Sequence, residues 1–376
     1  LVTLRLLDRW LEEGPSAAAS GGWAARAVEG AIDQMDEGSP IPSILRSVLA
    51  AMQEAHPADL HGVLPRLLAY GQALEYDAKW TLAMDVYETV IAHAHPTDES
   101  DAAISAHLRK AFCLRTLGSF ADALAVYATA EAVASRAGDM LNVLRARIGD
   151  AKVAIARGNL PRAEAVLDET ISQASQLGIH TIRALALQDR AMVAGLRGRH
   201  DIAVELAYQA MREAPSPVNR DRILSDIGTA FQRLGLRSVA RDAFLVLSAT
   251  AQEQYMRWVA TLSLMGIAAE DGSEPLFEQY RAQLRPTEMP PQLETEYYIY
   301  LGRAYRHLER EDLGQIALAK AVQLAEHYGF FALLFEAEDE LRSAMPLRQT
   351  AGEVSPEVSE IASEVRQMRD AALADI

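Results

Sequence analysis

The sequence predicts an all-α solenoid of about eight helical hairpins, and three observations lead to this fold class. Glycines recur every forty residues early in the chain and every thirty-seven later, at Gly118, Gly158, Gly198, Gly235 and Gly272. Two columns of small residues keep the same register. Between them, apolar residues are spaced three and four apart, as on one face of a helix. A lone hairpin cannot cover its own apolar face, so neighbouring hairpins are expected to stack.

The first column of small residues lies seven positions before each turn glycine, on the first helix of each unit. Seven of its eight members are Ala or Gly: Ala31, Gly71, Ala111, Ala151, Ala191, Gly228, Met265 and Gly302. The second column lies five positions after the glycine, on the second helix: Ser43, Ala83, Ala123, Ala163, Ala203, Ala240, Phe277 and Gly314. Small residues in both columns predict close packing between the two helices of each hairpin.

The two ends of the chain differ from the repeats. Residues 1–13 predict an amphipathic helix, and residues 14–22 predict a flexible linker. At the other end a loop precedes Ser355 and Pro356, which predict the N-cap and first residue of a final helix. The predicted segments are therefore 1–22, a superhelix over 23–341, and a loop with a C-terminal capping helix over 342–376. Both end helices are expected to cap the solenoid; the alternative for the first is insertion into a groove or a second subunit.

The columns carry a resemblance to the tetratricopeptide repeat. Two first helices match its signature, at Tyr298-x-x-Leu301-Gly302-x-x-Tyr305 and Leu224-x-x-Ile227-Gly228-x-x-Phe231. Second helices match at Ala240-x-x-x-Phe244 and at Ala203 followed by Pro215. The longer repeat resembles the variety found in bacterial regulator sensor domains and in kinesin light chains. The resemblance implies a right-handed superhelix whose first helices line a concave groove.

Composition and charge argue against several classes of protein. Half of the residues are hydrophobic, yet no apolar run approaches the roughly eighteen residues of a membrane helix. A net charge of −16 argues against nucleic acid as the main partner. The one cysteine, Cys113, excludes an intramolecular disulfide. We therefore expect a cytoplasmic protein that binds neither membrane nor nucleic acid.

The sequence contains no catalytic motif that we recognise. Phosphate-binding glycine loops, HExxH and GxSxG are all absent. His93 and His95, beside Asp98, Glu99 and Asp101, form the one close group of metal-ligand types, in a segment expected to be a solvated loop. We therefore expect a non-catalytic chain without cofactor or metal. The enzymatic alternative is a phosphatase or a metal-dependent hydrolase.

The resemblance implies which side chains line the groove. The candidate groove residues are Arg115, Arg145, Lys152, Gln188, Met192, Arg222, Gln232, Gly266, Arg303 and Arg306. The six bases predict an acidic partner segment, and Met192 and Gly266 leave room for its apolar face. The alternative is that the bases pair with neighbouring carboxylates.

The function expected from these features is a scaffold or sensor module that binds a protein or peptide segment, in bacterial signalling or regulation. The alternative is a small-ligand sensor domain of a larger transcriptional regulator or ATPase, with the effector domain upstream of Leu1. The amphipathic terminal helices are further candidates for self-association.

Overall fold

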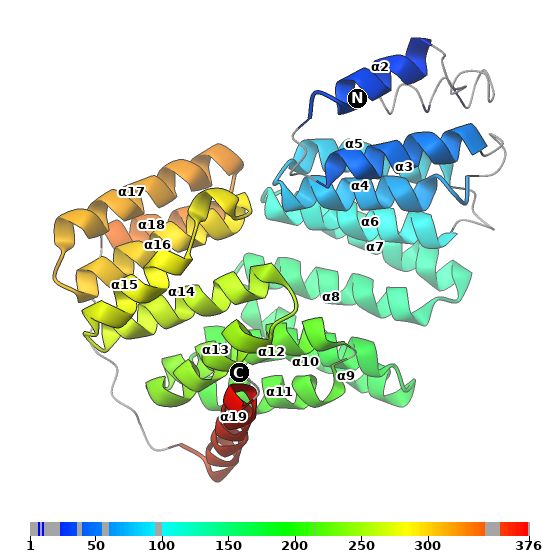
Figure 1. The fold of residues 1–376 in the computed structure, drawn as a ribbon. Helices are drawn as coiled ribbons and strands as arrows, with labels where there is room; N and C mark the ends of the chain where they lie inside the picture. The colour runs from blue at the N-terminus through cyan, green and yellow to red at the C-terminus, as the bar shows by residue number, and fades with distance from the viewer. Residues whose placement is uncertain are drawn as a thin grey trace. The chain divides into compact units, whose positions relative to one another are not determined.

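The computed structural model describes residues 7, 10, 23–35, 40–54, 60–94, 100–214, 216–342 and 354–374. Within these ranges every regular element is a helix and no strand occurs, which confirms the predicted all-α solenoid (Figure 1). The chain forms two compact units, residues 1–149 and 150–376. Most of the predicted N-terminal helix and linker lies outside the described residues, as do His95, Asp98, Glu99 and Pro215.

Unit 1 consists of consecutive antiparallel helices. They are α2 (Trp23–Ile32), α3 (Ile41–Glu54), α4 (Leu64–Tyr76), α5 (Trp80–His93), α6 (Ser100–Thr116), α7 (Phe120–Ala137) and α8 (Met140–Ala156), which continues into unit 2. Helices α4 and α5 pack as one hairpin and α6 and α7 as the next, and α5 packs on α6. The small-residue columns fall on first and second helices as the sequence predicts.

Unit 2 continues the alternation of first and second helices. Its elements are α9 (Leu160–Gln176), α10 (His180–Leu196), α11 (His200–Glu213), α12 (Pro217–Arg233), α13 (Arg237–Thr250), α14 (Gln254–Glu270), α15 (Glu274–Gln283), the short η2 (Pro286–Glu288), α16 (Pro291–His307), α17 (Glu311–Tyr328), α18 (Phe331–Arg342) and α19 (Pro356–Ala374). The hairpins α10–α11, α12–α13, α14–α15 and α16–α17 stack in chain order. Helix α18 is a further first helix, which the eight predicted hairpins did not include.

The recurring glycines end the first helices. Gly118, Gly158, Gly198, Gly235 and Gly272 all adopt a positive φ, between 71° and 77°. The residue after each glycine donates its N–H to a carbonyl five positions back, as Asn159 does to Ala154 at 2.8 Å. This is the Schellman arrangement, in which the left-handed residue is most favourably glycine. The repeat signal in the sequence is therefore a helix-stop signal.

The small residues of the first column let the second helix approach. A Cβ atom added at Gly302 would lie 2.5 Å from Cγ of Leu318, and one at Gly228 would lie 2.9 Å from the ring of Phe244. Both neighbours belong to the second helix of the same hairpin. Glycine at these positions therefore permits a large side chain to pack directly on the first-helix backbone.

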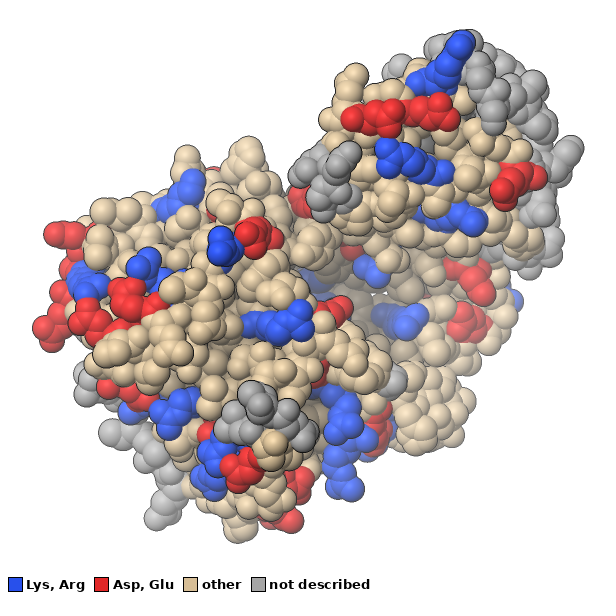
Figure 2. Space-filling view, viewed as in Figure 1, with Lys and Arg blue, Asp and Glu red and all other residues tan. Residues whose placement is uncertain are grey.

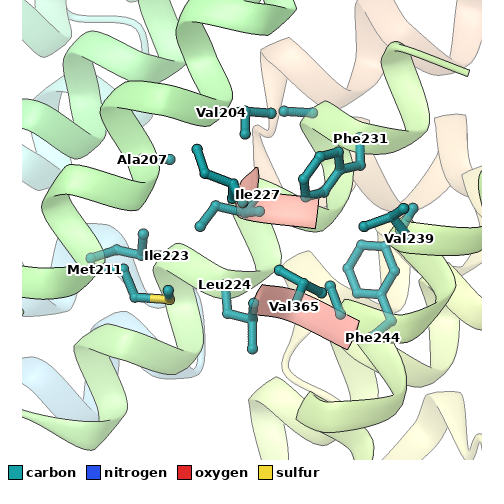
Figure 3. Close-up of a cluster of buried hydrophobic side chains, with 14 of the residues drawn as sticks. Val204, Ala207, Met211, Ile223, Leu224, Ile227, Phe231, Val239, Phe244 and Val365 are labelled. Carbon is teal, nitrogen blue, oxygen red and sulfur yellow. The ribbon is translucent and has the colours of Figure 1, made fainter. Parts of the chain in front are cut away.

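The core of unit 2 is a cluster shared by α10 to α14 and by the C-terminal helix α19. Ile227 and Leu224 lie near its middle, Phe231, Val239 and Phe244 lie together on one side, and Val365 of α19 joins them (Figure 3). Ser355 caps α19 as predicted, accepting a hydrogen bond from the N–H of Val358 at 3.2 Å.

The sequence predicts that the final helix, α19, caps the end of the solenoid, but the structure places this helix elsewhere. It packs on the second helices α13 and α11 instead. The last helix before it, α18, has no second helix of its own among the described residues. Phe335 consequently keeps 69% of its surface exposed, whereas Leu187, on the first helix α10 of a complete hairpin, keeps 2%.

Candidate peptide-binding surface

The candidate groove residues of unit 1 lie on α6 and α8 and make few polar contacts. The guanidinium carbon of Arg115 lies 5.1 Å from the centre of the Phe112 ring, a cation–π contact. Arg145 is exposed, and its Nη1 donates to Oδ1 of Asn142 at 3.3 Å. Neither arginine is held by a carboxylate in the contacts that the structure shows, so both keep a charge available to solvent.

The bases of unit 2 are paired with carboxylates on the next first helix. Nζ of Lys152 lies 3.3 Å from Oδ1 of Asp189, which joins α8 to α10. Arg222 of α12 lies 3.2 Å from Glu253, next to the start of α14. These pairs are the alternative that the sequence left open, in which the bases are balanced by neighbouring acids.

The last two candidate bases, on α16, are also paired. Arg303 of α16 lies 2.7 Å from Glu340 and 2.8 Å from Glu336, both on α18. Arg306 is buried, with 6% of its surface exposed, and its Nη1 donates to the carbonyl of Glu340 at 2.8 Å. It also lies 3.4 Å from Glu311. The assignment of Arg306 to an open groove is therefore corrected, because its side chain fills space between α16, α17 and α18.

The predicted glutamines extend the same pattern. Nε2 of Gln188 donates to Asp226 at 2.6 Å, and Nε2 of Gln232 donates to Glu270 at 2.6 Å. Each bond joins one first helix to the next, α10 to α12 and α12 to α14. Together with the ion pairs, they form a ladder of side-chain contacts along the first helices. We call the surface that carries this ladder in unit 2 the first-helix face.

Some carboxylates of the first-helix face have amides rather than bases as their hydrogen-bond partners. Asp226 accepts from Gln188, Glu270 from Gln232, and Glu296 from Gln292. Asp226 reaches solvent, yet desolvation by its surroundings is the main cause that raises its pKa to about 6; the charge of Asp189 contributes to this rise, and the hydrogen bond from Gln188 opposes it. Desolvation likewise raises the pKa of Glu296 to about 6. This face therefore holds carboxylates that would gain from a cationic partner.

The first-helix face also includes open and apolar positions. Met192 keeps 44% of its surface exposed on α10. A Cβ atom added at Gly266 of α14 would be in ordinary contact with Tyr300, at 3.5 Å. Figure 2 shows blue and red side chains interspersed on each unit rather than gathered by sign. The geometry thus gives a mixed polar and apolar surface instead of a strip of positive charge.

Two polar clusters, one of them around the buried Glu75, were not identified from the sequence. In unit 1, Glu75 accepts hydrogen bonds from Tyr87 at 2.5 Å and from Arg109 at 2.9 Å. Burial raises the pKa of Glu75, and the charge of Arg109 opposes that rise. The cluster joins α4, α5 and α6, so it fixes how successive helices pack. Because its residues lie far apart in the sequence, no local sequence pattern predicts this cluster.

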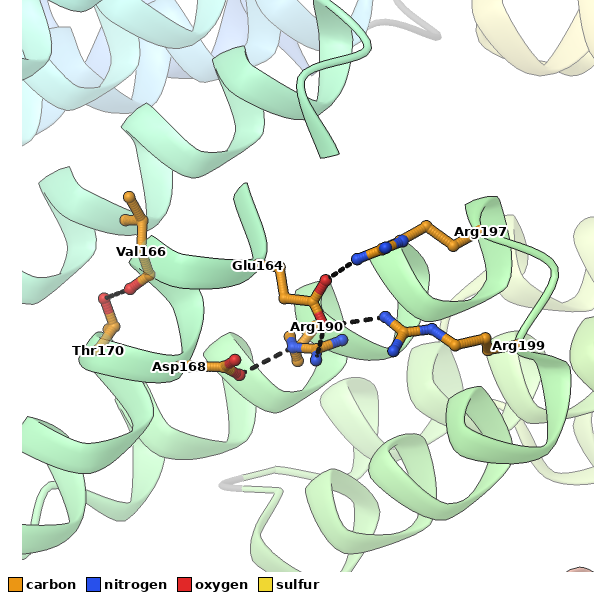
Figure 4. Close-up of polar contacts among 7 residues, drawn as sticks. All are labelled: Glu164, Val166, Asp168, Thr170, Arg190, Arg197 and Arg199. Carbon is orange, nitrogen blue, oxygen red and sulfur yellow. Dashed lines mark hydrogen bonds and ion pairs between the residues drawn. The ribbon is translucent and has the colours of Figure 1, made fainter. Parts of the chain in front are cut away.

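The second cluster, in unit 2, surrounds Glu164 of α9 (Figure 4). Glu164 contacts Arg190, Arg197 and Arg199, and Arg190 also donates to Asp168 at 2.8 Å. Arg197 and Arg199 flank the turn glycine between α10 and α11, which is the one sequence signal that could have indicated the cluster. It ties three consecutive helices together, so we assign it a structural role.

No three His, Cys, Asp or Glu side chains within the described ranges are grouped so as to hold a metal ion. None of the described helices is both long and apolar enough to cross a membrane.

Comparison with known proteins supports the fold. No family model matches the chain, and no curated protein matches it. The structure is similar to the apo form of the quorum sensor NprR from B. thuringiensis, with a TM-score of 0.54 and 14% sequence identity over 85% of this chain and 97% of that one. It also matches BtubC from P. vanneervenii at a TM-score of 0.36 and 14% identity, over 78% and 97% of the two chains. At such identity the likeness to NprR shows the helical-repeat fold alone.

Proposed function

We propose that this chain is a non-catalytic sensor or scaffold module that binds a protein or peptide segment on the first-helix face of unit 2. The observation that carries the proposal is the ladder along α8, α10, α12 and α14, which holds polar side chains at regular intervals on one face. Groups already fixed by neighbours cost little entropy to order when a ligand binds. The fold likeness to a quorum sensor supports a role in bacterial regulation.

The charges of this face suggest the chemistry of the partner. A partner carboxylate would have to displace Asp189 from Lys152 or Glu253 from Arg222. A partner lysine or arginine would instead meet Asp226 and Glu270, which accept hydrogen bonds from the neutral amides of Gln188 and Gln232. We therefore propose a segment with at least one basic residue next to apolar ones, in place of the acidic segment expected from the sequence.

Selection from a library of displayed random peptides on the immobilised protein tests this function. Peptides enriched in Arg or Lys should emerge, and their affinity should fall on Asp226→Asn. The matched control is Asp201→Asn, which removes the same charge from another exposed position, on the second helix α11 rather than on the first-helix face.

The same selection has outcomes that would contradict the proposal. Acid-rich peptides that lose affinity on Arg222→Ala would restore the acidic partner. Peptides insensitive to both Asp226→Asn and Arg222→Ala would exclude the first-helix face. Failure to select any peptide would favour the small-ligand sensor.

A further inference from the structure

The outer face of the second helices α11 and α13 already holds an amphipathic helix, which is α19. Val358, Ile361 and Val365 of α19 are buried there, in the same cluster as Val204 and Phe244 (Figure 3). These anchors are spaced three and four residues apart, which is the arrangement of a helix laid into a groove. The contact is between α19 and the two second helices, α11 and α13.

The sequence makes α11 and α13 more apolar at two positions than the second helices α7 and α9. Tyr208 on α11 and Leu245 on α13 lie five residues after the alanine of the second column. At the same position, α7 has Ala128 and α9 has Asp168. One residue before the column stand Ile202 and Val239, whereas α7 and α9 have Asp122 and Arg162. The outer face of α11 and α13 is therefore shaped for a helical occupant.

Polar contacts at this surface select the charge of the occupant. Nη1 of Arg369 lies 2.8 Å from Oδ1 of Asp242, which keeps 5% of its surface exposed. The hydroxyl of Tyr208 donates to Glu364, and that of Ser355 lies 3.4 Å from Glu205. Because Asp242 is on the face that α19 covers, release of α19 would return its carboxylate to water. The ion pair therefore favours an arginine in the occupant without making the contact irreversible.

We propose that the outer face of α11 and α13 is a second interaction surface, which accepts an amphipathic helix from a partner protein, and that α19 is its built-in competitor. The partner helix would carry the pattern of α19: apolar anchors equivalent to Val358, Ile361 and Val365, with an arginine one turn later to meet Asp242. This surface is separate from the first-helix face, so the inference goes beyond the proposed function.

Because α19 belongs to the same chain as its binding surface, it competes strongly with a partner helix. A segment joined to its site by a short connection acts at an effective concentration of about millimolar. A partner helix with the same contacts is therefore largely excluded, and its apparent dissociation constant equals the intrinsic one divided by the fraction of sites that α19 leaves open. Weakening α19 raises that fraction. Access to the surface is thus set by how firmly α19 is docked.

A fluorescent synthetic peptide with the sequence of residues 356–374 is the probe, and the full chain is its target. The Arg369→Ala chain should bind the probe about tenfold or more tightly than the wild type, because its own α19 has lost the contact with Asp242. The Arg366→Ala chain is the matched control, since Arg366 is exposed on the same helix. It should bind the probe as the wild type does.

A second arm tests where the probe binds. A short bis-maleimide bridge between Tyr208→Cys and Glu364→Cys should hold α19 in place and abolish probe binding; the native Cys113 is buried. A probe carrying Arg369→Ala should bind the Arg369→Ala chain about tenfold more weakly than the unmodified probe. That difference should vanish when the chain also carries Asp242→Asn. Equal binding to bridged and unbridged chains, or no binding to the Arg369→Ala chain, would overturn the proposal.

Discussion

At the scale of single residues, the glycines of the first helices decide how closely each hairpin closes. Gly302 has Leu318 against its Cα and the carbonyl of Gly314 nearby, so an added methyl group has no room. Gly266, on the preceding first helix, has only the ring of Tyr300 at ordinary contact distance. The same residue type therefore has a packing role at one position and none at the other.

Replacing these two glycines by alanine should have opposite effects. Gly302→Ala should lower the free energy of unfolding by about 1–3 kcal/mol through overpacking. Gly266→Ala should leave it unchanged or raise it by up to about 1 kcal/mol, because alanine is the better helix former. Urea unfolding followed by circular dichroism measures both. An equal loss for both variants would mean that the close approach at Gly302 is not real.

The raised pKa of Asp226 gives a pH-dependent effect on stability. The pKa rises from 3.8 in the reference state to about 6 in the fold, so the fold disfavours the ionised form. The stability that Asp226 contributes is full below about pH 4 and is lost as the pH rises to about 6. Asp226→Asn removes this loss, so the variant should gain stability relative to the wild type between pH 4 and pH 6.5.

Urea unfolding at several pH values measures this difference, with Asp201→Asn as the control for loss of one exposed carboxylate. A relative stability of Asp226→Asn that is independent of pH would show that the carboxyl group is not desolvated in the fold.

At the scale of the helix, an apolar residue of a first helix can be core or surface, depending on whether the hairpin is complete. Leu187 is buried by the helices packed against α10, whereas Phe335 stands on α18, which has no second helix among the described residues. Leu187→Ala should lower the free energy of unfolding by about 2–5 kcal/mol. Phe335→Ala should change stability by no more than about 0.5 kcal/mol.

Thermal and urea unfolding of both variants test this contrast. A loss above about 2 kcal/mol for Phe335→Ala would show that α18 is covered in solution, by another segment of the chain or by another molecule.

At the scale of the whole molecule, each helix contacts mainly its neighbours in sequence, so stability is expected to be a sum of local terms. Arg303 illustrates this, because it joins α16 to α18 through Glu336 and Glu340. Arg303→Ala should destabilise the docking of α18 by about 1 kcal/mol. Hydrogen exchange should become faster in α18 and stay unchanged in α10 and α12.

Exchange that became faster throughout unit 2 would contradict this expectation. It would mean that the unit opens as one cooperative block rather than from its end.

Much of the fold followed from the sequence because its signals are local. A glycine at positive φ ends the five first helices from α6 to α14, small residues mark the hairpin contacts, and Ser355 caps the last helix where its side chain predicts. Each of these depends on residues within one turn or one hairpin. The repeat of these signals made the all-α solenoid predictable.

The candidate surface and the place of α19 depended on the tertiary structure. The sequence assigned six bases to the groove, but only the packing of successive repeats brings Glu253 to Arg222, Asp189 to Lys152 and Glu340 to Arg303. It likewise predicted a final helix that caps the solenoid, but the face that this helix covers depends on which outer surface is apolar. Ion pairs and docking are contacts between residues far apart in sequence, and their partners are fixed only when the chain has folded.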